Sequence, residues 1–328
     1  MILKHVSGIR ELAFPEVSMN CNQDSNVIET NTEALASKMS CVSAGYYEDK
    51  YIRFFCSSHV RRNPIINLGY AIRVAVFRNL VESFVTLYPR GQIVSIGSGS
   101  DTLGFWILDK TVNVTFFEVD FCSVVAAKSK VIQKHQSVFG RFFQPTEAAK
   151  EGRFSLVGFD LRDDTHLLLR DLKKAGFDFS RPSLFIAECA LIYLDHAVND
   201  AITSTIAVSG TDACAPVFFA SYDQVNPSDR FGRIMMANLE ARGCPLRSIE
   251  KDTSSQVSRL RESGFSNVRV ECMSYFTNRC KTKRPEIIDE VEELNLLQDH
   301  YMFTFACARS DEAGFQLLSN SVFFESPS

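Results

Sequence analysis

Residues 92–102 read QIVSIGSGSDT, an apolar run that leads directly into a turn rich in glycine and serine. Such a turn after a strand is typical of nucleotide-binding sheets, because glycine permits a tight turn and the close approach of a ligand. Gly97 and Gly99 match the first two glycines of G-x-G-x-x-G, but Thr102 occupies the third position. No G-K-[ST] follows, which excludes a Walker phosphate loop, and the charge of Asp101 would repel a pyrophosphate. The turn therefore favours a cofactor without phosphates.

Six further apolar runs follow, and most are separated by segments long enough for a helix. The seven runs are 92–97, 114–120, 154–163, 183–194, 217–223, 268–273 and 301–308. The first five lack polar alternation, which predicts parallel strands buried on both faces between two helical layers. The last two predict a late antiparallel edge strand. We therefore expect an α/β fold with a mostly parallel seven-stranded sheet.

Two segments without strand character flank this pattern. Residues 1–90 predict a helical N-terminal layer, in which the polar stretch 20–34 predicts a loose arm and helical spacing of apolar residues begins near residue 32. Residues 91–328 predict the core that contains the sheet. A segment at about 225–262 interrupts the strand and helix rhythm. We expect it to form a helical cap over the carboxyl ends of the strands, where ligands bind in open α/β sheets.

The composition is that of a soluble globular protein, with 45% hydrophobic residues, 23% charged residues and a net charge of -4 over 328 residues. This charge provides no basic field, so we expect no nucleic-acid partner. No signal peptide or membrane span is visible, and we expect a cytoplasmic protein. Ten cysteines occur without a C-x-x-C pair and six histidines without metal-binding spacing, so we expect reduced cysteines and no metal site.

Acidic residues follow the predicted strands at positions suited to a nucleoside. Glu118 and Asp120 end the second run, where a carboxylate can accept hydrogen bonds from both hydroxyls of a ribose, and the glycine turn favours Asp120 for this role. Asp160 and Leu161 end the third run and predict an adenine clamp of one carboxylate and one backbone N–H. Glu188 lies in an otherwise apolar fourth run, and a buried carboxylate is costly unless it is paired.

Together these features form the pattern of an S-adenosylmethionine site. That ligand also presents a carboxylate, for which Lys38 and Arg73 in the helical layer are the candidate cations. The alternative for each is a solvated charge on a helix surface.

Six segments of the chain resemble the leucine carboxyl methyltransferases, which methylate the C-terminal leucine of the catalytic subunit of type 2A protein phosphatases. They are NLGYAIRV, SIGSGSDT, FFEVD, DLRD, AECALIYL and YDQVNPSDRFGRIMMANLEARGCPL. The likeness extends from about Lys38 to about Ala308, and the last segment favours the leucine enzyme over relatives with other substrates. It implies a class I methyltransferase fold, which is Rossmann-like, S-adenosylmethionine as cofactor, and a monomer that binds the phosphatase tail.

The resemblance also implies residue roles at the cofactor. Lys38 and Arg73 correspond to the residues that hold its methionine carboxylate, and Glu188 corresponds to an acidic residue near the methionine moiety. Gly97 corresponds to the contact in the glycine turn, and Asp120 to the ribose ligand. The residues that match the adenine clamp are Asp160 and Leu161.

On the acceptor side, we expect Tyr193 to donate a hydrogen bond to the carboxylate that receives the methyl group. Glu188 is expected to pair with the ammonium of the cofactor. The end of the fifth strand and the segment after it are expected to bind the substrate through Tyr222, Arg230 and Arg233. A C-terminal carboxyl has a pKa of about 3.3 to 3.7 and is ionised at neutral pH, so no general base is needed.

Two alternatives remain open at this point. A small-molecule O-methyltransferase could share the whole fold and act on free hydroxyls or acids. A nicotinamide-dependent dehydrogenase could share the glycine turn and the acidic end of the second strand.

Overall fold

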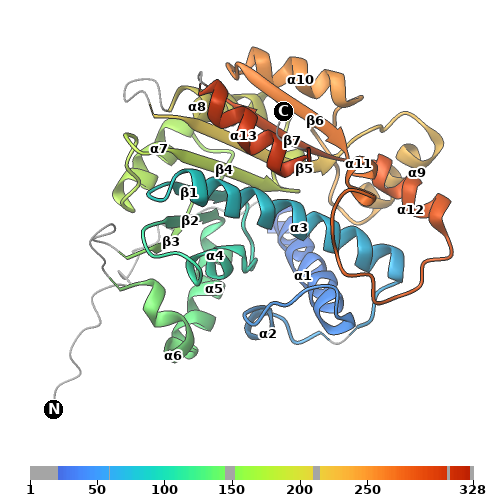
Figure 1. Ribbon diagram of the computed structural model, residues 1–328, viewed down its shortest axis with the longest axis horizontal. Helices are drawn as coiled ribbons and strands as arrows, with labels where there is room; N and C mark the ends of the chain where they lie inside the picture. Colours follow the sequence, from blue (N-terminus) through green and yellow to red (C-terminus); the bar gives the residue numbers. More distant parts are fainter. Residues whose placement is uncertain (1–20, 59, 145–151, 210–214, 309–310, 326–328) are drawn as a thin grey trace.

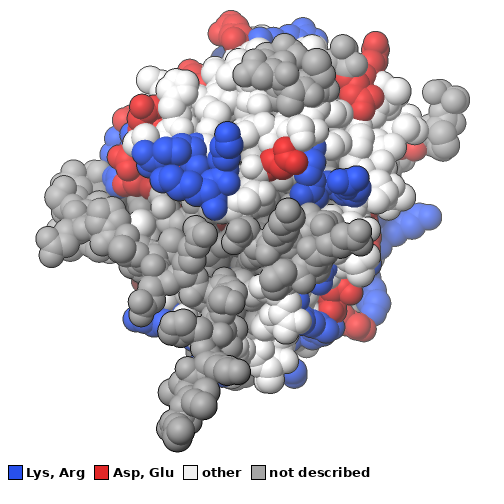
Figure 2. Space-filling model, turned by 90° about the vertical axis from the view of Figure 1, so that its left-hand side faces the viewer, with Lys and Arg blue, Asp and Glu red and all other residues white. Residues whose placement is uncertain are grey.

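A computed structural model describes residues 21–58, 60–144, 152–209, 215–308 and 311–325 of the chain (Figure 1). The first 20 residues of the expected N-terminal layer lie outside the described residues. None of the described helices is long and apolar enough to cross a membrane. Lys and Arg side chains on one face lie in groups beside Asp and Glu side chains (Figure 2), so this face has no field of a single sign.

The centre of the molecule is one seven-stranded sheet in the order β3-β2-β1-β4-β5-β7-β6. The strands are β1 (Gln92–Ile96), β2 (Thr115–Asp120), β3 (Phe154–Gly158), β4 (Ser183–Glu188), β5 (Val217–Gln224), β6 (Asn267–Cys272) and β7 (Tyr301–Cys307). The first five are parallel, and β7 is antiparallel to both β5 and β6. The expected mostly parallel sheet is confirmed, and this is the class I methyltransferase topology. The antiparallel strand, however, lies inside the sheet, and β6 forms the edge.

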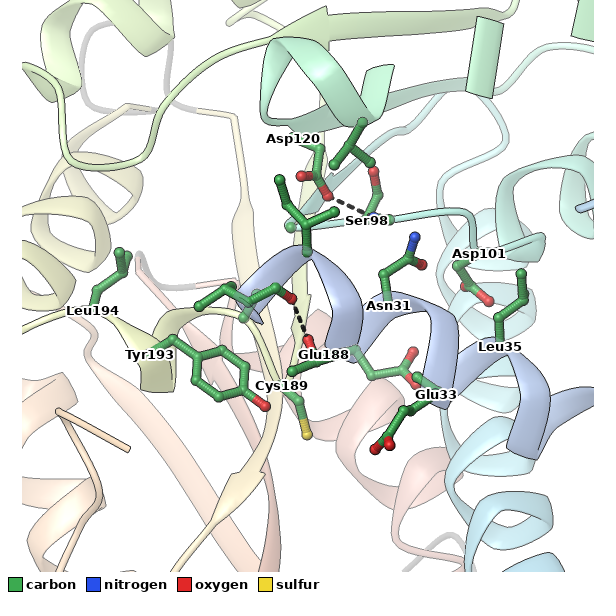
Figure 3. A pocket seen from close by; sticks show the side chains of 18 of the residues that line it. Asn31, Glu33, Leu35, Ser98, Asp101, Asp120, Glu188, Cys189, Tyr193 and Leu194 are labelled. Carbon is green, nitrogen blue, oxygen red and sulfur yellow. Dashed lines mark hydrogen bonds between the residues drawn. The ribbon is translucent and has the colours of Figure 1, made fainter. Parts of the chain in front are cut away.

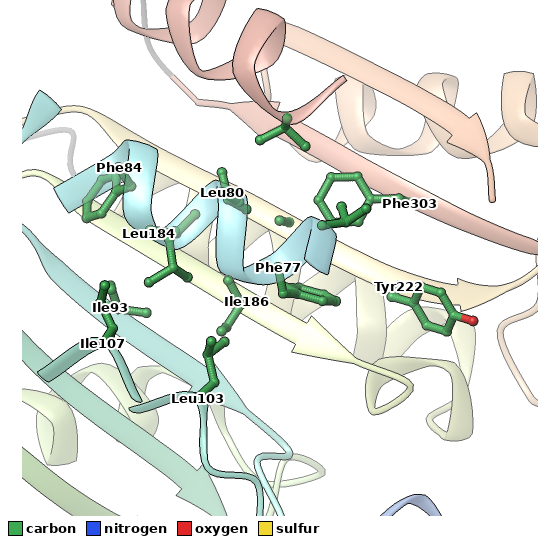
Figure 4. Close-up of a cluster of buried hydrophobic side chains, with 14 of the residues drawn as sticks. Phe77, Leu80, Phe84, Ile93, Leu103, Ile107, Leu184, Ile186, Tyr222 and Phe303 are labelled. Carbon is green, nitrogen blue, oxygen red and sulfur yellow. The ribbon is translucent and has the colours of Figure 1, made fainter. Parts of the chain in front are cut away.

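One face of the sheet is covered by α3 (Pro64–Leu87), which lies across the strands in Figure 1. The helix begins at Asn63, whose side chain accepts a hydrogen bond from the Ile65 backbone N–H, and Pro64 fills the first helical position. Its apolar side chains pack on those of the strands (Figure 4). The labelled members of this core are Phe77, Leu80, Phe84, Ile93, Leu103, Ile107, Leu184, Ile186, Tyr222 and Phe303.

The opposite face of the sheet carries a second core beneath α7 (Thr165–Lys174), α8 (His196–Val208) and α10 (Thr253–Glu262). Helix side chains such as Leu172 and Leu260 meet strand side chains such as Phe185 there. Because successive side chains of a strand point to opposite faces, both cores need apolar residues at every strand position. This explains the absence of polar alternation in the first five runs.

The N-terminal layer consists of α1 (Cys21–Ala44), α2 (Ile52–Phe55) and α3. The prediction of a loose arm is wrong from Cys21 onward, because this polar stretch is the first half of α1. Its polarity serves contacts with the rest of the fold: Asn31 accepts from the backbone N–H of Ser100 at 2.8 Å. Local composition alone shows no such partner.

The insertion after β5 contains α9 (Arg230–Ala241) and α10, which have different neighbours. The start of α9 packs on the end of α12 (Val291–Asp299), where the rings of Phe231 and His300 lie 4.4 Å apart between centroids. Helix α10 instead packs on β6 as part of the helical layer. The other elements are α4 (Leu103–Leu108), α5 (Cys122–Lys134), α6 (Gln136–Phe139), η1 (Gly140–Phe142), η2 (Leu191–Tyr193), α11 (Ser274–Thr277) and α13 (Glu312–Val322).

Candidate functional site

A cavity of about 700 Å³ lies at the carboxyl ends of β1, β2 and β4. Helix α1 forms one wall, the start of α3 a second, and the loop after α9 a third. In Figure 3, Asp120 and Ser98 lie at one end of the cavity, and Tyr193 and Cys189 lie at the other. This volume lies within the range of small-molecule sites, and the position is the one where open α/β sheets bind ligands.

The glycine turn and the end of β2 form the first part of the cavity wall. Gly97 and Gly99 have φ of 63° and 53°, which favours glycine at both positions. Asp120 Oδ2 accepts from the backbone N–H of Gly99 at 2.6 Å, and its Oδ1 accepts from Phe121 N–H at 2.7 Å. Burial raises the pKa of Asp120, and these two N–H groups oppose the rise. The glycine turn is therefore hydrogen-bonded directly to Asp120, the residue predicted to bind the ribose.

A cluster of four charged side chains lies at the centre of the cavity. Lys38 of α1 lies 2.9 Å from Asp101 and 2.8 Å from Glu188, and Arg73 of α3 donates from Nε to Glu188. Burial opposes the charge of Lys38, but the two carboxylates outweigh it and raise the pKa of this ammonium. Burial also favours a neutral Asp101, yet Lys38 lowers its pKa to about 2. The two cations and two anions thus compensate one another.

Glu118 was the weaker candidate for the ribose, and the structure places it elsewhere. Its side chain is buried beneath the glycine turn and accepts a hydrogen bond from Lys128 of α5. Lys128 Nζ also donates to the backbone oxygen of Asp101 at 2.6 Å. Burial raises the pKa of Glu118 to about 7 in spite of Lys128. Nothing in the sequence around Lys128 indicated this pairing, which holds the turn on α5.

The opposite end of the cavity is formed by the segment after β4. Cys189 adopts φ of 51°, which is uncommon outside glycine, and its N–H donates to the oxygen of Tyr222 at 2.8 Å. This backbone turns the chain out of the sheet, so β4 ends at Glu188 rather than at residue 194 as expected. Tyr193 lines the cavity, and burial raises its pKa well above the usual value. Its phenol is therefore neutral.

Of the two residues of the predicted adenine clamp, Leu161 lines the cavity and Asp160 does not. Leu161 lines the cavity together with Phe121 and Phe159. The carboxylate of Asp160 does not, because Arg162 donates to both of its oxygens, at 2.9 Å from Nε and 2.5 Å from Nη2. Arg162 itself lines the cavity.

The three predicted substrate residues lie outside the cavity wall. Tyr222 is buried with its ring centroid 4.4 Å from the guanidinium carbon of Arg73, so it supports Arg73 from behind instead of facing a ligand. Arg230 and Arg233 are exposed on α9. The part of the insertion that reaches the cavity is the loop after α9, through Arg242 and its neighbours.

Contacts between α1 and this loop were missed in the sequence. Cys244 Sγ lies 3.2 Å from the backbone oxygen of Asn26, and Arg242 lies 3.3 Å from Glu33. With Asn31 on the glycine turn, α1 connects the two sides of the cavity. No sequence signal indicated these contacts, because residues 20–34 read as polar coil.

The residues present fit S-adenosylmethionine. The cluster of Lys38, Arg73 and Glu188 offers both signs of charge to the zwitterionic methionine portion, Asp120 suits a ribose, and apolar side chains line the space beside it. Lys38 keeps Asp101 anionic in the turn, and this charge disfavours a ligand with phosphates. Among the described residues, no group of His, Cys, Asp and Glu could hold a metal ion.

Comparison with known proteins agrees with this geometry. The model of a family described as leucine carboxyl methyltransferase matches residues 26–207. The chain belongs to the leucine carboxyl methyltransferase family. It is an enzyme, a carboxyl methyltransferase, and S-adenosylmethionine is its cofactor. The nicotinamide alternative is therefore wrong.

Two relatives show how much of the methyltransferase is shared. A leucine carboxyl methyltransferase 1 homolog of Arabidopsis thaliana is 36% identical, over 84% of this chain and 87% of its own length. Leucine carboxyl methyltransferase 1 of Rattus norvegicus is 32% identical, over 94% of this chain and 98% of its own. A solved DUF574-family protein of Streptomyces avermitilis shares the fold, with a TM-score of 0.54 and 13% identity, over 84% of this chain and 97% of its own.

Proposed function

We propose that this methyltransferase esterifies the α-carboxylate of the C-terminal leucine of the catalytic subunit of a type 2A protein phosphatase. The observation that supports this most is the compensated cluster of Lys38, Arg73 and Glu188 beside the neutral phenol of Tyr193, in one cavity of a chain of this family. The names of the two relatives described in the preceding section point to the carboxyl group of a leucine as the acceptor.

We propose that the charged cluster holds the methionine portion of the cofactor. Arg73 and Lys38 would bind its carboxylate and Glu188 its ammonium. In the structure these side chains are bonded to one another, so a zwitterion can replace their mutual contacts without leaving an unpaired charge. Gly97 and Asp120 would hold the ribose side of the ligand.

The adenine would lie against Leu161 and the apolar side chains of Phe121 and Phe159. Because Arg162 occupies both oxygens of Asp160, contact of that carboxylate with an exocyclic amine would require Arg162 to move. The Leu161 backbone N–H remains the proposed donor to a ring nitrogen.

The cofactor supplies an electrophilic methyl group, and the protein must bring an acceptor oxygen to it. A terminal carboxylate is ionised at neutral pH, so no residue has to remove a proton. Tyr193 keeps its proton because burial raises its pKa, so it can donate a hydrogen bond that orients the acceptor. We propose that positioning and the exclusion of water provide the rate enhancement.

A protein acceptor must also contact the outer surface. We propose that α9, with Arg230 and Arg233 exposed, contacts the folded body of the phosphatase while its tail enters the cavity. We further propose that the enzyme acts as a cytoplasmic monomer.

The test is methyl transfer from radiolabelled S-adenosylmethionine to the intact phosphatase subunit and to a subunit that lacks its final leucine. We expect base-labile label on the first protein only. Equal labelling of both would disprove leucine as the acceptor. A panel of free hydroxyl compounds and acids, tested beside the subunit, distinguishes a small-molecule O-methyltransferase.

A further inference from the structure

The cationic side chains of the cavity wall differ in whether they have a partner. Within the described residues, five of the six are paired with carboxylates. The pairs are Lys38 with Asp101 and Glu188, Arg73 with Glu188, Arg162 with Asp160, Arg242 with Glu33, and Arg247 with Asp195. The sixth cation is Arg62, which has no carboxylate partner among the described residues.

The backbone of Arg62 is fixed by hydrogen bonds, whereas its side chain forms no ion pair with the described residues. Its N–H donates to Ser40 Oγ at 2.9 Å, and its oxygen accepts from Asn67 Nδ2 at 3.3 Å. Its Nε is buried and has no hydrogen-bond partner among the described residues. A buried donor without a partner is unfavourable by roughly 1 to 3 kcal/mol. The fixed backbone and the unsatisfied donor together indicate a group that binds an anion from outside the chain.

The position of Arg62 separates it from the cofactor. Ile66, Tyr70 and Arg73 line the cavity at helical spacing and form a stripe along the start of α3. Arg62, two residues before the helix begins, also lines the cavity and extends this stripe beyond the N-terminus of α3. From Asn63 to Arg73 the helix rises roughly 15 Å at 1.5 Å per residue. Arg73 is bonded to Glu188 at the cofactor end, so Arg62 lies at the far end of the stripe.

We propose that Arg62 binds an acidic side chain of the acceptor tail, upstream of the leucine that is methylated. This inference rests on the proposed function, because it requires a protein C-terminus as acceptor. The reacting carboxylate must lie next to the cofactor, too far from Arg62 to be its partner. An extended chain covers roughly 3.3 Å per residue. After allowance for the reach of the guanidinium, the acidic residue lies two to four positions before the terminal leucine.

This contact selects substrates rather than performing chemistry. A guanidinium and a carboxylate form a charge-assisted and often bidentate pair, which discriminates against a neutral tail of the same shape. Because the contact is made equally before and during methyl transfer, it lowers KM and leaves kcat unchanged.

The experiment uses phosphatase catalytic subunits that end in leucine and carry either Glu or Gln at each of the five preceding positions in turn. Wild-type enzyme, Arg62→Gln and Arg62→Lys are compared. Arg61→Gln is the matched control, because Arg61 is the adjacent arginine, lies outside the cavity wall and pairs with Glu286 at 2.6 Å. Calorimetric cofactor affinity for each variant reports whether the site is folded.

We expect one position, between two and four residues before the end, at which Glu lowers the wild-type KM about tenfold relative to Gln. Arg62→Gln should abolish this preference with unchanged kcat and cofactor affinity, Arg62→Lys should keep part of it, and Arg61→Gln should keep all of it. If wild type methylates Glu and Gln tails equally at every position, or if Arg62→Gln keeps the preference, this inference is wrong while the proposed function stands. If the wild-type enzyme methylates none of these tails, both the proposed function and this inference are wrong.

Discussion

Arg73 of α3 and Glu188 at the end of β4 are 115 residues apart in the sequence and hydrogen-bonded in the fold, with Arg73 Nε donating to Glu188 Oε1. Each was predicted to meet a different charged group of the cofactor. Their pairing shows that the site keeps its charges compensated without help from a ligand. The ring of Tyr222 beneath Arg73 fixes the direction of the guanidinium.

Arg73→Ala should weaken cofactor binding by on the order of 1.5 to 3 kcal/mol, because a charge-assisted hydrogen bond is lost. Calorimetry measures this directly. Arg242→Gln is the control, since Arg242 lines the cavity from the loop after α9 and pairs with the exposed Glu33 instead of with Glu188. Unchanged affinity in folded Arg73→Ala would remove this residue from the cofactor site.

Asp120→Asn and Asp120→Ala should form a graded series. Asparagine retains one oxygen that can accept from Gly99 N–H, whereas alanine leaves the N–H groups of Gly99 and Phe121 without their partner. We expect cofactor affinity to fall about tenfold in the first variant and further in the second. An equal loss in both variants would mean that the turn does not depend on the remaining oxygen.

Gly97→Ala should destabilise the fold itself, and not only obstruct a ligand. A Cβ at this position would lie 2.3 Å from the Cβ of Ala190, and φ is 63°. The positive φ costs about 1 to 2 kcal/mol and the overpacking about 1 to 3 kcal/mol. Adding Ala190→Gly should remove the cost of overpacking and leave the cost of the positive φ. Denaturant unfolding measures both. No recovery in the double variant would show that Ala190 is not the cause.

Tyr193→Phe should lower kcat/KM severalfold and leave the shape of the pH profile unchanged. Burial raises the pKa of this phenol well above its usual value, so the group keeps its proton throughout pH 6 to 8 and the phenol does not titrate there. The acceptor is ionised across the same window. We therefore expect a flat kcat profile for both proteins. A tail with an amidated C-terminus should be inert, and its methylation would contradict transfer to a carboxylate.

The buried pair of Glu118 and Lys128 offers a test of stability that is separate from binding. Glu118→Leu leaves Lys128 buried without its partner and should cost about 3 to 5 kcal/mol of unfolding free energy. The double variant Glu118→Leu with Lys128→Met should restore most of the lost unfolding free energy, because the lysine charge beneath the turn is then removed as well. A double variant as unstable as the single one would show that Lys128 acts mainly through its bond to the Asp101 oxygen.

The sequence by itself determined where the strands lie along the chain and that the first five are parallel. Each of the seven apolar runs coincides with one strand of the sheet, although β5 and β6 each extend one residue beyond their runs. The first five runs lack alternation because strands that are buried on both faces need apolar residues on both faces. It also determined that Gly97, Asp120 and Glu188 would meet at one edge, since the carboxyl ends of parallel strands lie together. These are consequences of local pattern and of the handedness of strand connections.

Only the tertiary structure decided which charges are paired. Glu188 meets Arg73 and Lys38, and Glu118 meets Lys128 beneath the turn, whereas Arg62 Nε has no hydrogen-bond partner in the part of the chain that the structure describes. A charged residue reads alike in a sequence whether its partner is a neighbouring helix, a ligand or water.

The same reason explains why the polar start of α1 was read as a loose arm and Tyr222 as a substrate contact. In the fold, Asn31 is bonded to the glycine turn, and the ring of Tyr222 lies under Arg73. Burial and pairing depend on residues that are far apart in the sequence, and chain packing alone brings them into contact.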